Sequence, residues 1–353
     1  MTFDAEKQRG RHAEHPWQIP WVGWQDVLWR VWNEISRDNI LDTAASVAFY
    51  GLLALYPALI ATVSMYGLLA DPIDVVQQVN SLTIALPATA RSVVLTQLTS
   101  IARGSGPGLT LGFSFSLAFA VFSASSGVAA MMRGINAAYD EQETRGWLRQ
   151  RLVALFFTLG LSLFVVIAVA LITLLPPVLA QLGLASSARG LIQLLRWPAL
   201  AFATMAGLAL LYRYGPNRTP ARWQWVMPGA ILATMIWTAA SFSFSVYAEN
   251  FGRFNKTYGA LGGAVVLSLW MFLSAVAILV GAELNAELEH QTGADSTVGP
   301  PRPMGRRDAA MADKLGDARP DAEPKTFRDA LRATVADLYR KGKRKPRLTE
   351  PEP

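Results

Sequence analysis

The chain has 353 residues, of which 52% are hydrophobic and only 16% are charged, and it carries a net charge of +6. Soluble domains carry about 25% charged residues, so this composition indicates a membrane protein with several spans. The chain contains no cysteine, which excludes disulfides, cysteine-ligated zinc, iron–sulfur clusters and thiol nucleophiles.

The N-terminal arm, residues 1–43, is rich in tryptophan and has helical periodicity. Apolar side chains recur on one face and charged ones on the other: Trp24, Val27, Leu28, Val31, Trp32 and Ile35 against Asp26, Arg30, Glu34 and Arg37. This pattern predicts an amphipathic helix in the membrane interface, with indole rings at headgroup level. A helix that binds a partner protein is the alternative.

Six apolar runs follow, and each is long enough to cross a hydrocarbon core of about 30 Å as a helix. They cover residues 44–70, 109–132, 152–175, 191–212, 226–248 and 261–282. The sequence therefore predicts an all-α membrane domain over residues 44–290. We expect the third span to end near Pro176 and Pro177.

The basic residues are distributed unevenly between the two sides that six spans define. The N-terminus, the loops after the second and fourth spans, and the C-terminus share one side and contain most of the Lys and Arg residues. The positive-inside rule places that side in the cytoplasm. We therefore expect both termini to be cytoplasmic.

The segment between the first two spans, residues 71–108, has two amphipathic stretches that Pro87 separates. This pattern predicts a pair of helices that covers the external mouth of the bundle. An ordinary packed loop is the alternative.

The C-terminal region, residues 291–353, has a different composition from the membrane domain. Residues 293–324 are rich in Pro, Gly, Asp and Arg, which predicts a disordered linker. Residues 326–339 regain helical periodicity, and the basic run KGKRKPR follows. We expect this tail to contact anionic lipids. Nucleic acid is not an expected partner, because no aromatic stacking platform accompanies the basic run.

Candidate substrate-path residues lie within the spans or at their ends: Tyr50, Pro57, Asn136, Arg196 and Glu283. Pro57 would free a backbone carbonyl in mid-span, although an ordinary kink also explains it. Arg196 would reach the interface or bind an anion. Glu283 and Glu287, one turn apart, would form a solvated helix end or pair with Arg133, Arg145 or Arg149.

The connector between the last two spans, residues 249–258, is short, aromatic and predicted to be turn-rich. Asn255, Tyr258 and Gly259 are the candidate residues for an external site. Gly259 and Gly263 also begin a small-residue ridge, which favours close packing of helices. The connector would therefore either contact a substrate or simply close a turn.

No motif for hydrolysis, phosphate binding or dinucleotide binding is found in the chain. The three histidines lie outside the apolar runs, so we predict neither a metal site nor a cofactor. Any acid–base chemistry would depend on a few carboxylates at span ends. We therefore expect a protein that is not an enzyme.

Several separated motifs resemble the YihY/BrkB family of bacterial inner-membrane proteins. The matching pieces are DTAASVAFYGLLALYP, MRGINAAYDEQETRGW, FSVYAENFGRFNKTYGALGG and LWMFLSAVAILVGAELNAELE, all within residues 24–289. The resemblance implies six spans in the bacterial inner membrane with both termini inside. Members have carried the names virulence factor BrkB and ribonuclease BN; the second is a misnomer here, since no clustered ligands for a nuclease metal are present.

The pattern and the resemblance together lead to one main hypothesis, a transporter or flippase for a small or lipidic substrate. A membrane scaffold that does not transport and maintains the cell envelope is the alternative. An intramembrane enzyme or an enzyme that processes RNA is the third hypothesis.

Overall fold

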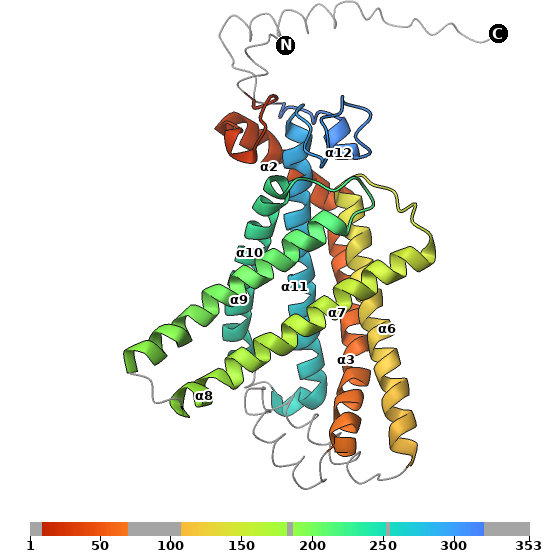
Figure 1. Ribbon diagram of the computed structural model, residues 1–353, viewed down its shortest axis with the longest axis vertical. Helices are drawn as coiled ribbons and strands as arrows, with labels where there is room; N and C mark the ends of the chain where they lie inside the picture. The colour runs from red at the N-terminus through yellow and green to blue at the C-terminus, as the bar shows by residue number, and fades with distance from the viewer. Residues whose placement is uncertain (1–8, 70–106, 182–185, 252–254, 321–353) are drawn as a thin grey trace, which may run out of the picture. The chain divides into compact units, whose positions relative to one another are not determined.

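The computed structural model describes residues 9–69, 107–181, 186–251 and 255–320, and in these ranges every regular element is a helix. The elements are η1 (Pro16–Gln18), α2 (Trp21–Arg37), α3 (Ile40–Leu69), α6 (Pro107–Ala138), α7 (Trp147–Thr173), α8 (Leu175–Gln181), α9 (Ser186–Tyr214), α10 (Trp223–Phe251), α11 (Asn255–Gln291) and α12 (Ala310–Asp313) (Figure 1). The chain divides into two units, Met1–Gly316 and Asp317–Pro353. Of the second unit, the described part reaches only residue 320.

Five helices of the described part are long and apolar enough to cross a membrane. They are Ser114–Ala138, Trp147–Thr173, Ser186–Tyr214, Trp223–Tyr247 and Gly263–Gln291. They include the predicted fourth span, although a charged residue, Arg196, and a proline, Pro198, lie in its first turns. The predicted first span corresponds to α3, whose shorter apolar segment is Ile40–Ala54. The protein is therefore a multi-pass helical membrane protein, and six as the number of spans stays a prediction.

The third span ends near the prolines, as predicted. The ends of the fifth and sixth spans differ from the prediction. Helix α7 ends at Thr173, and α8 takes Pro176 and Pro177 into its first turn, where a missing N–H removes no intrahelical bond. In contrast, most of the predicted turn-rich connector is helical, because α10 continues to Phe251 and α11 begins at Asn255. No proline interrupts the connector, and extending an existing helix adds one hydrogen bond per residue.

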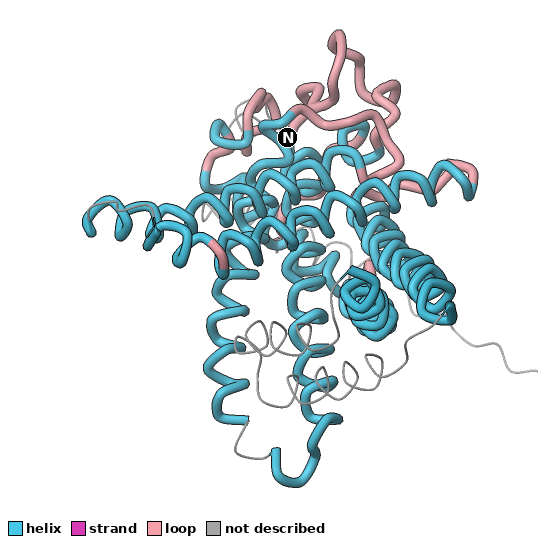
Figure 2. Tube along the Cα trace, turned by 60° about the horizontal axis from the view of Figure 1, so that its bottom comes forward, coloured by secondary structure: helices cyan, strands magenta, loops and turns pink. Residues whose placement is uncertain are grey.

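Four helices, α3, α6, α10 and α11, lie side by side and form the centre of the bundle (Figures 1 and 2). Their contacts use small residues. A Cβ added at Gly281 would lie 2.6 Å from the carbonyl oxygen of Gly229, so α10 and α11 are in backbone contact there. Gly127 of α6 faces α3 less closely, since a Cβ added there would lie 3.5 Å from Tyr50 Cβ, an ordinary van der Waals contact. Small residues allow this approach, which supplies the packing contacts that hold helices together in lipid.

Helices α7 and α9 contact the other helices less extensively and expose most of their apolar side chains. Phe156 of α7 is 73% exposed and Phe202 of α9 is 65% exposed. Apolar surface of this extent is costly in water and is expected where lipid surrounds a helix.

The C-terminal end of α11 is enclosed by residues 9–20, 139–146, 215–222 and 292–316, which we call the capped end. Backbone hydrogen bonds join these segments: Gly293 N–H donates to Arg11 O, and Thr219 N–H donates to Asp308 O. Residues 293–316, predicted as part of a disordered linker, are therefore folded. The apolar content of the segment is low, but Met311 packs into the hydrophobic core and a buried arginine bonds the rest of the segment together.

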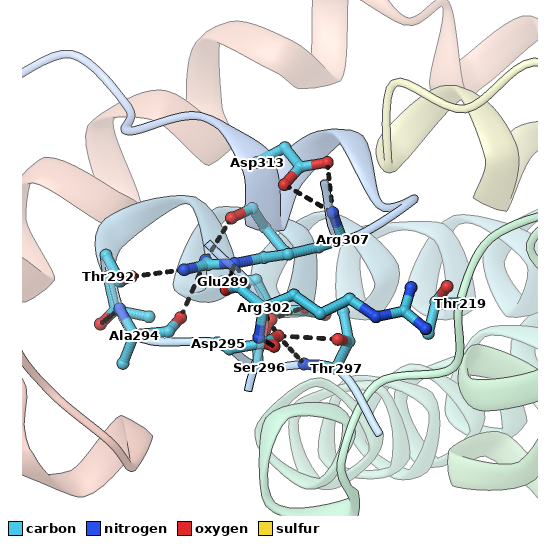
Figure 3. A network of polar contacts seen from close by, with 12 residues as sticks. Thr219, Glu289, Thr292, Ala294, Asp295, Ser296, Thr297, Arg302, Arg307 and Asp313 are labelled. Atoms are coloured by element: carbon cyan, nitrogen blue, oxygen red, sulfur yellow. Dashed lines mark hydrogen bonds and ion pairs between the residues drawn. The ribbon is translucent and has the colours of Figure 1, made fainter. Parts of the chain in front are cut away.

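That arginine is Arg307, which is 4% exposed. Its guanidinium donates to the carbonyl oxygens of Gly293, Ala294 and Ala312, as Figure 3 shows in part. Asp313 accepts from the backbone N–H of Arg307. A buried cation with this many acceptors holds the chain in one conformation. The folded membrane domain thus extends beyond residue 290 to Gly316.

Helix α2 buries two charged residues that its pattern assigns to solvent, together with Val27 and Val31 of the predicted apolar face. Asp26 and Arg30, assigned to the solvent face, are buried at 0% and 5% exposure, whereas Trp32, assigned to the apolar face, is 77% exposed. Asp26 and Arg30 are buried because ion pairs compensate their desolvation. Arg9 binds Asp26 at 2.9 Å, and Arg30 binds Glu287 of α11.

Candidate functional site

The last turns of α11 place polar side chains at the capped end, where other elements bury them. Glu283, Asn285, Glu287 and Glu289 are each at most 1% exposed. They are buried because α11 runs on past its apolar segment and α2, α3 and the capped-end loops pack around it. Removing a carboxylate from water costs several kcal/mol unless a cation or hydrogen bonds compensate for it. Their partners therefore show what this site can do.

Glu287 is compensated by a cation from the N-terminal arm. Arg30 Nε donates to its carboxylate, and Arg30 Nη2 donates to the carbonyl oxygen of Glu287 at 3.1 Å and to Gln291 Oε1 at 2.8 Å. The guanidinium thus joins α2 to two successive turns of α11. This arrangement is structural, since its hydrogen bonds fix one helix on another.

Glu289 is compensated in the same way from the loop between α9 and α10. Arg218 donates two hydrogen bonds to its carboxylate, at 3.2 and 2.6 Å, and Ser296 Oγ donates a third. The guanidinium of Arg218 also lies 4.8 Å from the ring centre of Tyr139. Two-point binding of this kind fixes the loop as well as neutralising the charge.

Asn285 uses its amide to join α11 to α10. Its Oδ1 accepts from the backbone N–H of Gly229 at 2.7 Å, and its Nδ2 donates to Val226 O at 3.0 Å. The two bonds hold the Asn285 side chain against the backbone of α10 on both sides of Pro228.

Glu283 is the exception among these groups. Apart from Asp38, no group in the described part of the chain forms a hydrogen bond with its carboxylate oxygens. The group beside it is another acid, Asp38, which lies between α2 and α3. The buried Tyr139 hydroxyl, near Glu283 and Asn285, also has no hydrogen-bond partner of normal geometry within the described ranges.

Burial raises the pKa of Asp38 from 3.8 to about 6. This value includes repulsion by Glu34 and Asp140, which adds to the effect of burial, and the hydrogen bond with Glu283 and the charge of Arg37, which both lower the pKa. Two carboxyl groups can form such a hydrogen bond when one of them is protonated. The pair is therefore suited to holding a proton.

The partners that the sequence analysis gave to Glu283 and Glu287 are wrong. Arg145 binds Glu143 at 2.6 Å and the carbonyl oxygen of Gly215 at 2.9 Å, and Arg133 and Arg149 are exposed. A solvated helix end is also wrong, because both carboxylates are buried. The real partners, Arg30 and Asp38, precede the first apolar run and carry no spacing signal that links them to α11.

Asn136 lies at the capped end, where it joins two loops. Its Nδ2 donates to Glu143 at 3.1 Å, and its Oδ1 accepts from the backbone N–H of Asn217 at 2.8 Å. Asn217 in turn donates to Gln142 O and to Thr144. Both groups of the Asn136 amide are thus engaged within the protein.

The other candidates within the spans are distributed over different helices. Tyr50 and Pro57 are half-buried on α3. Arg196 of α9 donates to the carbonyl oxygen of Ile172 in α7 at 3.3 Å, and its guanidinium lies 5.2 Å from the ring centre of Trp197. Arg196 therefore joins α9 to α7, a third arrangement beside the two considered from sequence.

The external candidates Asn255, Tyr258 and Gly259 lie in the first turns of α11. Their side chains, like the predicted amphipathic pair of residues 71–108 and the basic tail after residue 320, lie outside the described residues. Among the residues that are described, no three His, Asp or Glu side chains are placed to hold a metal ion.

The model of the family named Virulence factor BrkB matches residues 31–305. The chain belongs to the BrkB family. The ribonuclease-like protein YfkH of Bacillus subtilis is 32% identical over 257 residues, which cover 69% of this chain and 88% of that protein. A UPF0761 membrane protein of Verminephrobacter eiseniae is 28% identical over 75% of this chain and 62% of its own length.

Another UPF0761 membrane protein, from Laribacter hongkongensis, is 28% identical over 74% of this chain and 61% of its own length. The BrkB-family chain thus spans less than two thirds of these two relatives. No solved structure matches it. The matched residues include the whole site described above except Arg30, which directly precedes residue 31.

Proposed function

We propose that this BrkB-family protein is a transporter or flippase of a small or lipidic substrate in the bacterial inner membrane, with both termini cytoplasmic. The observation that carries the proposal is Glu283, a fully buried carboxyl group without a cation partner on an apolar helix. Ionisable groups in such positions are costly and commonly belong to proton relays or substrate pathways.

The surrounding contacts make this observation specific to Glu283. Glu287 and Glu289, one and two turns further along α11, each bind an arginine. The same helix end therefore provides cations for two acids and leaves the third with another acid. A loosely packed helix end would not separate its acids in this way.

Two features support a site beside lipid. The exposed apolar surfaces of α7 and α9 provide extensive contact with acyl chains, and the backbone contact between Gly229 and Gly281 fixes α10 against α11 next to Glu283. We also propose that the basic tail contacts anionic lipids of the inner leaflet.

The test is a flux assay in proteoliposomes with fluorescent lipids, inorganic ions and polar solutes. We expect the wild-type protein to move at least one class faster than empty liposomes, and Glu283→Gln to reduce that rate. Equal rates for wild-type protein and empty liposomes over all three classes would contradict the proposal.

A scaffold that does not transport is the second candidate, and the unit that begins at Asp317 favours it. This unit is separate from the membrane domain, as a segment that recruits partners would be. Removal of residues 317–353 is the discriminating variant, because residues 293–316 belong to the fold and must stay. A scaffold would lose its cellular function on this deletion, and a transporter would keep its flux.

A further inference from the structure

We propose that Asp38 and Glu283 form a proton-binding site, a carboxyl pair that shares one proton and joins the α2–α3 corner to α11. The coupling role that follows from it rests on the proposed transport function. The proton site itself rests on the complete burial of Glu283 without a cation partner and on the packing of α2 and α3 against α11.

The corner between α2 and α3 is short and places Asp38 against α11. Asp38 caps the C-terminus of α2, and its backbone N–H donates to Glu34 O at 2.9 Å. Asn39 follows with φ +50°, a left-handed conformation that asparagine adopts more readily than most residues. Helix α3 then begins at Ile40. These two residues thus fix the short corner between α2 and α3, and both helices pack against α11, which carries Glu283.

The two carboxyl groups differ in their access to water. Glu283 is 0% exposed, whereas Asp38 is half-buried. Asp38 is therefore the member that exchanges a proton with the solution, and Glu283 is the member that holds it away from water.

The groups that face the pair are mostly acidic. They are Glu34 and Arg37 on α2, Tyr139 and Asp140 after α6, and Glu287 on α11. Arg37, the cation of this set on α2, binds Glu34 at 2.6 Å and its side chain is 77% exposed. Glu287 is already neutralised by Arg30. Charge compensation for Glu283 is therefore incomplete without a bound proton.

The balance of the step involves one proton and no other reactant. In the bound state one carboxylic acid donates a hydrogen bond to the neighbouring carboxylate, and the pair carries a single negative charge. Loss of the proton to water leaves two carboxylates in contact, and their repulsion favours separation of the α2–α3 corner from α11. A proton from solution reverses the change. In a transporter, this exchange would link opening of the capped end to the proton gradient.

Infrared titration of the full chain in lipid nanodiscs tests the site directly. We expect the carbonyl stretch of a protonated carboxyl group to persist above the pH range of ordinary carboxyls, about 4, and to disappear in a one-proton step. Glu283→Gln is expected to remove the step of the pair and to leave at most the titration of Asp38, near pH 6. Asp38→Asn is expected to lower its midpoint by about one pH unit or more, because the repelling partner is gone.

Asp42→Asn is the matched control, since Asp42 is exposed four residues further along the chain, and the step should remain unchanged. A step above the titration of Asp38 that survives Glu283→Gln overturns the proton site. So does a midpoint that Asp38→Asn leaves in place, and this second variant tests the inference even if the first fails to fold.

Flux measured with and without an imposed pH gradient separates the proton site from the transport proposal. If the infrared step is present but no substrate shows flux, the proton site stands and the transport proposal is contradicted. If flux is the same with and without the pH gradient and persists in Glu283→Gln, the transport proposal stands and proton coupling is contradicted.

Discussion

Arg30 of α2 and Glu287 of α11 form a buried ion pair between positions 257 residues apart, and each side chain is at most 5% exposed. The pair fixes the N-terminal arm on the last span. Its arginine comes from a helix whose sequence pattern predicts a solvent-facing position for it.

Removal of Arg30 should strongly destabilise the protein. Arg30→Ala leaves the Glu287 carboxylate buried without its cation, and such a loss costs about 3–5 kcal/mol. The control is Arg37→Ala, because the Arg37–Glu34 pair is exposed on the arginine side and is worth about 0–1 kcal/mol. Thermal unfolding in nanodiscs measures both. Equal melting temperatures for the two variants would refute the structural role of Arg30.

Substitution of Gly281 should separate α10 from α11. The added Cβ of Gly281→Ala meets Gly229 O at 2.6 Å and Ala233 Cβ at 2.8 Å, and overpacking of this kind costs about 1–3 kcal/mol. Gly207→Ala on α9 is the control, since nothing lies within 4 Å of its added Cβ. That variant should gain up to about 1 kcal/mol from helix propensity. Chemical denaturation compares the two, and a neutral Gly281→Ala would be inconsistent with the close contact.

Asn136→Ala should lower the stability of the protein, and any loss of flux should follow from that loss of stability. The substitution removes the partners of Glu143 and of the backbone N–H of Asn217, at a cost of about 1–3 kcal/mol. Melting temperature and flux are measured on the same preparation. A variant with wild-type stability and reduced flux would instead support Asn136 as part of the substrate path.

The folded segment 292–316 should lose stability in acid through Asp295. Burial alone would raise the pKa of Asp295, but hydrogen bonds from Thr297 and Arg302, with the charge of Arg307, hold it below the usual 3.8. An acid with a lowered pKa contributes stability above its ordinary pKa and loses it as the pH falls through the folded value. Protease cleavage within the segment should therefore increase below about pH 4.

Asp295→Asn should already be weakened at neutral pH, by about 1.5–3 kcal/mol for hydrogen bonds to a charged group, and its cleavage should vary less with pH. Asp308→Asn is the control, because the Asp308 side chain is 84% exposed and asparagine tolerates its φ of +53°. The same pH profile for all three proteins would exclude Asp295 as the cause.

The exposed face of α2 should lie at the membrane interface. Trp21 and Trp32 are 69% and 77% exposed on the side opposite Arg30, and indole rings favour the headgroup region. Substituting both by Phe should reduce quenching of tryptophan fluorescence by lipids labelled near the headgroup and change stability by less than about 0.5 kcal/mol. Trp225→Phe, at a site 1% exposed, is the control. Unchanged quenching in the double variant would favour a partner protein on this face.

Some residues of the candidate site could be predicted from the local sequence, but their partners could not. Glu283 was identifiable because a carboxylate next to an apolar run is rare, and Asn136 because it is a polar residue shortly after the second apolar run, in the last turn of α6. Their partners were not identifiable: Asp38 and Asn217 come from other loops, and no spacing rule connects residues that meet only in three dimensions. The folding of residues 293–316 was missed because buried Arg307 organises this segment, and composition reports apolar content.

The sequence alone determined that this protein is helical and crosses a membrane several times, and it indicated the BrkB family. Those properties are local: an apolar run long enough for the bilayer must satisfy its backbone hydrogen bonds within itself. Tertiary structure decided which charges are neutralised and which is not. Arg30 neutralises Glu287 and Arg218 neutralises Glu289, whereas Asp38 meets Glu283, because the energy of a buried charge depends on neighbours that the fold brings from distant parts of the chain.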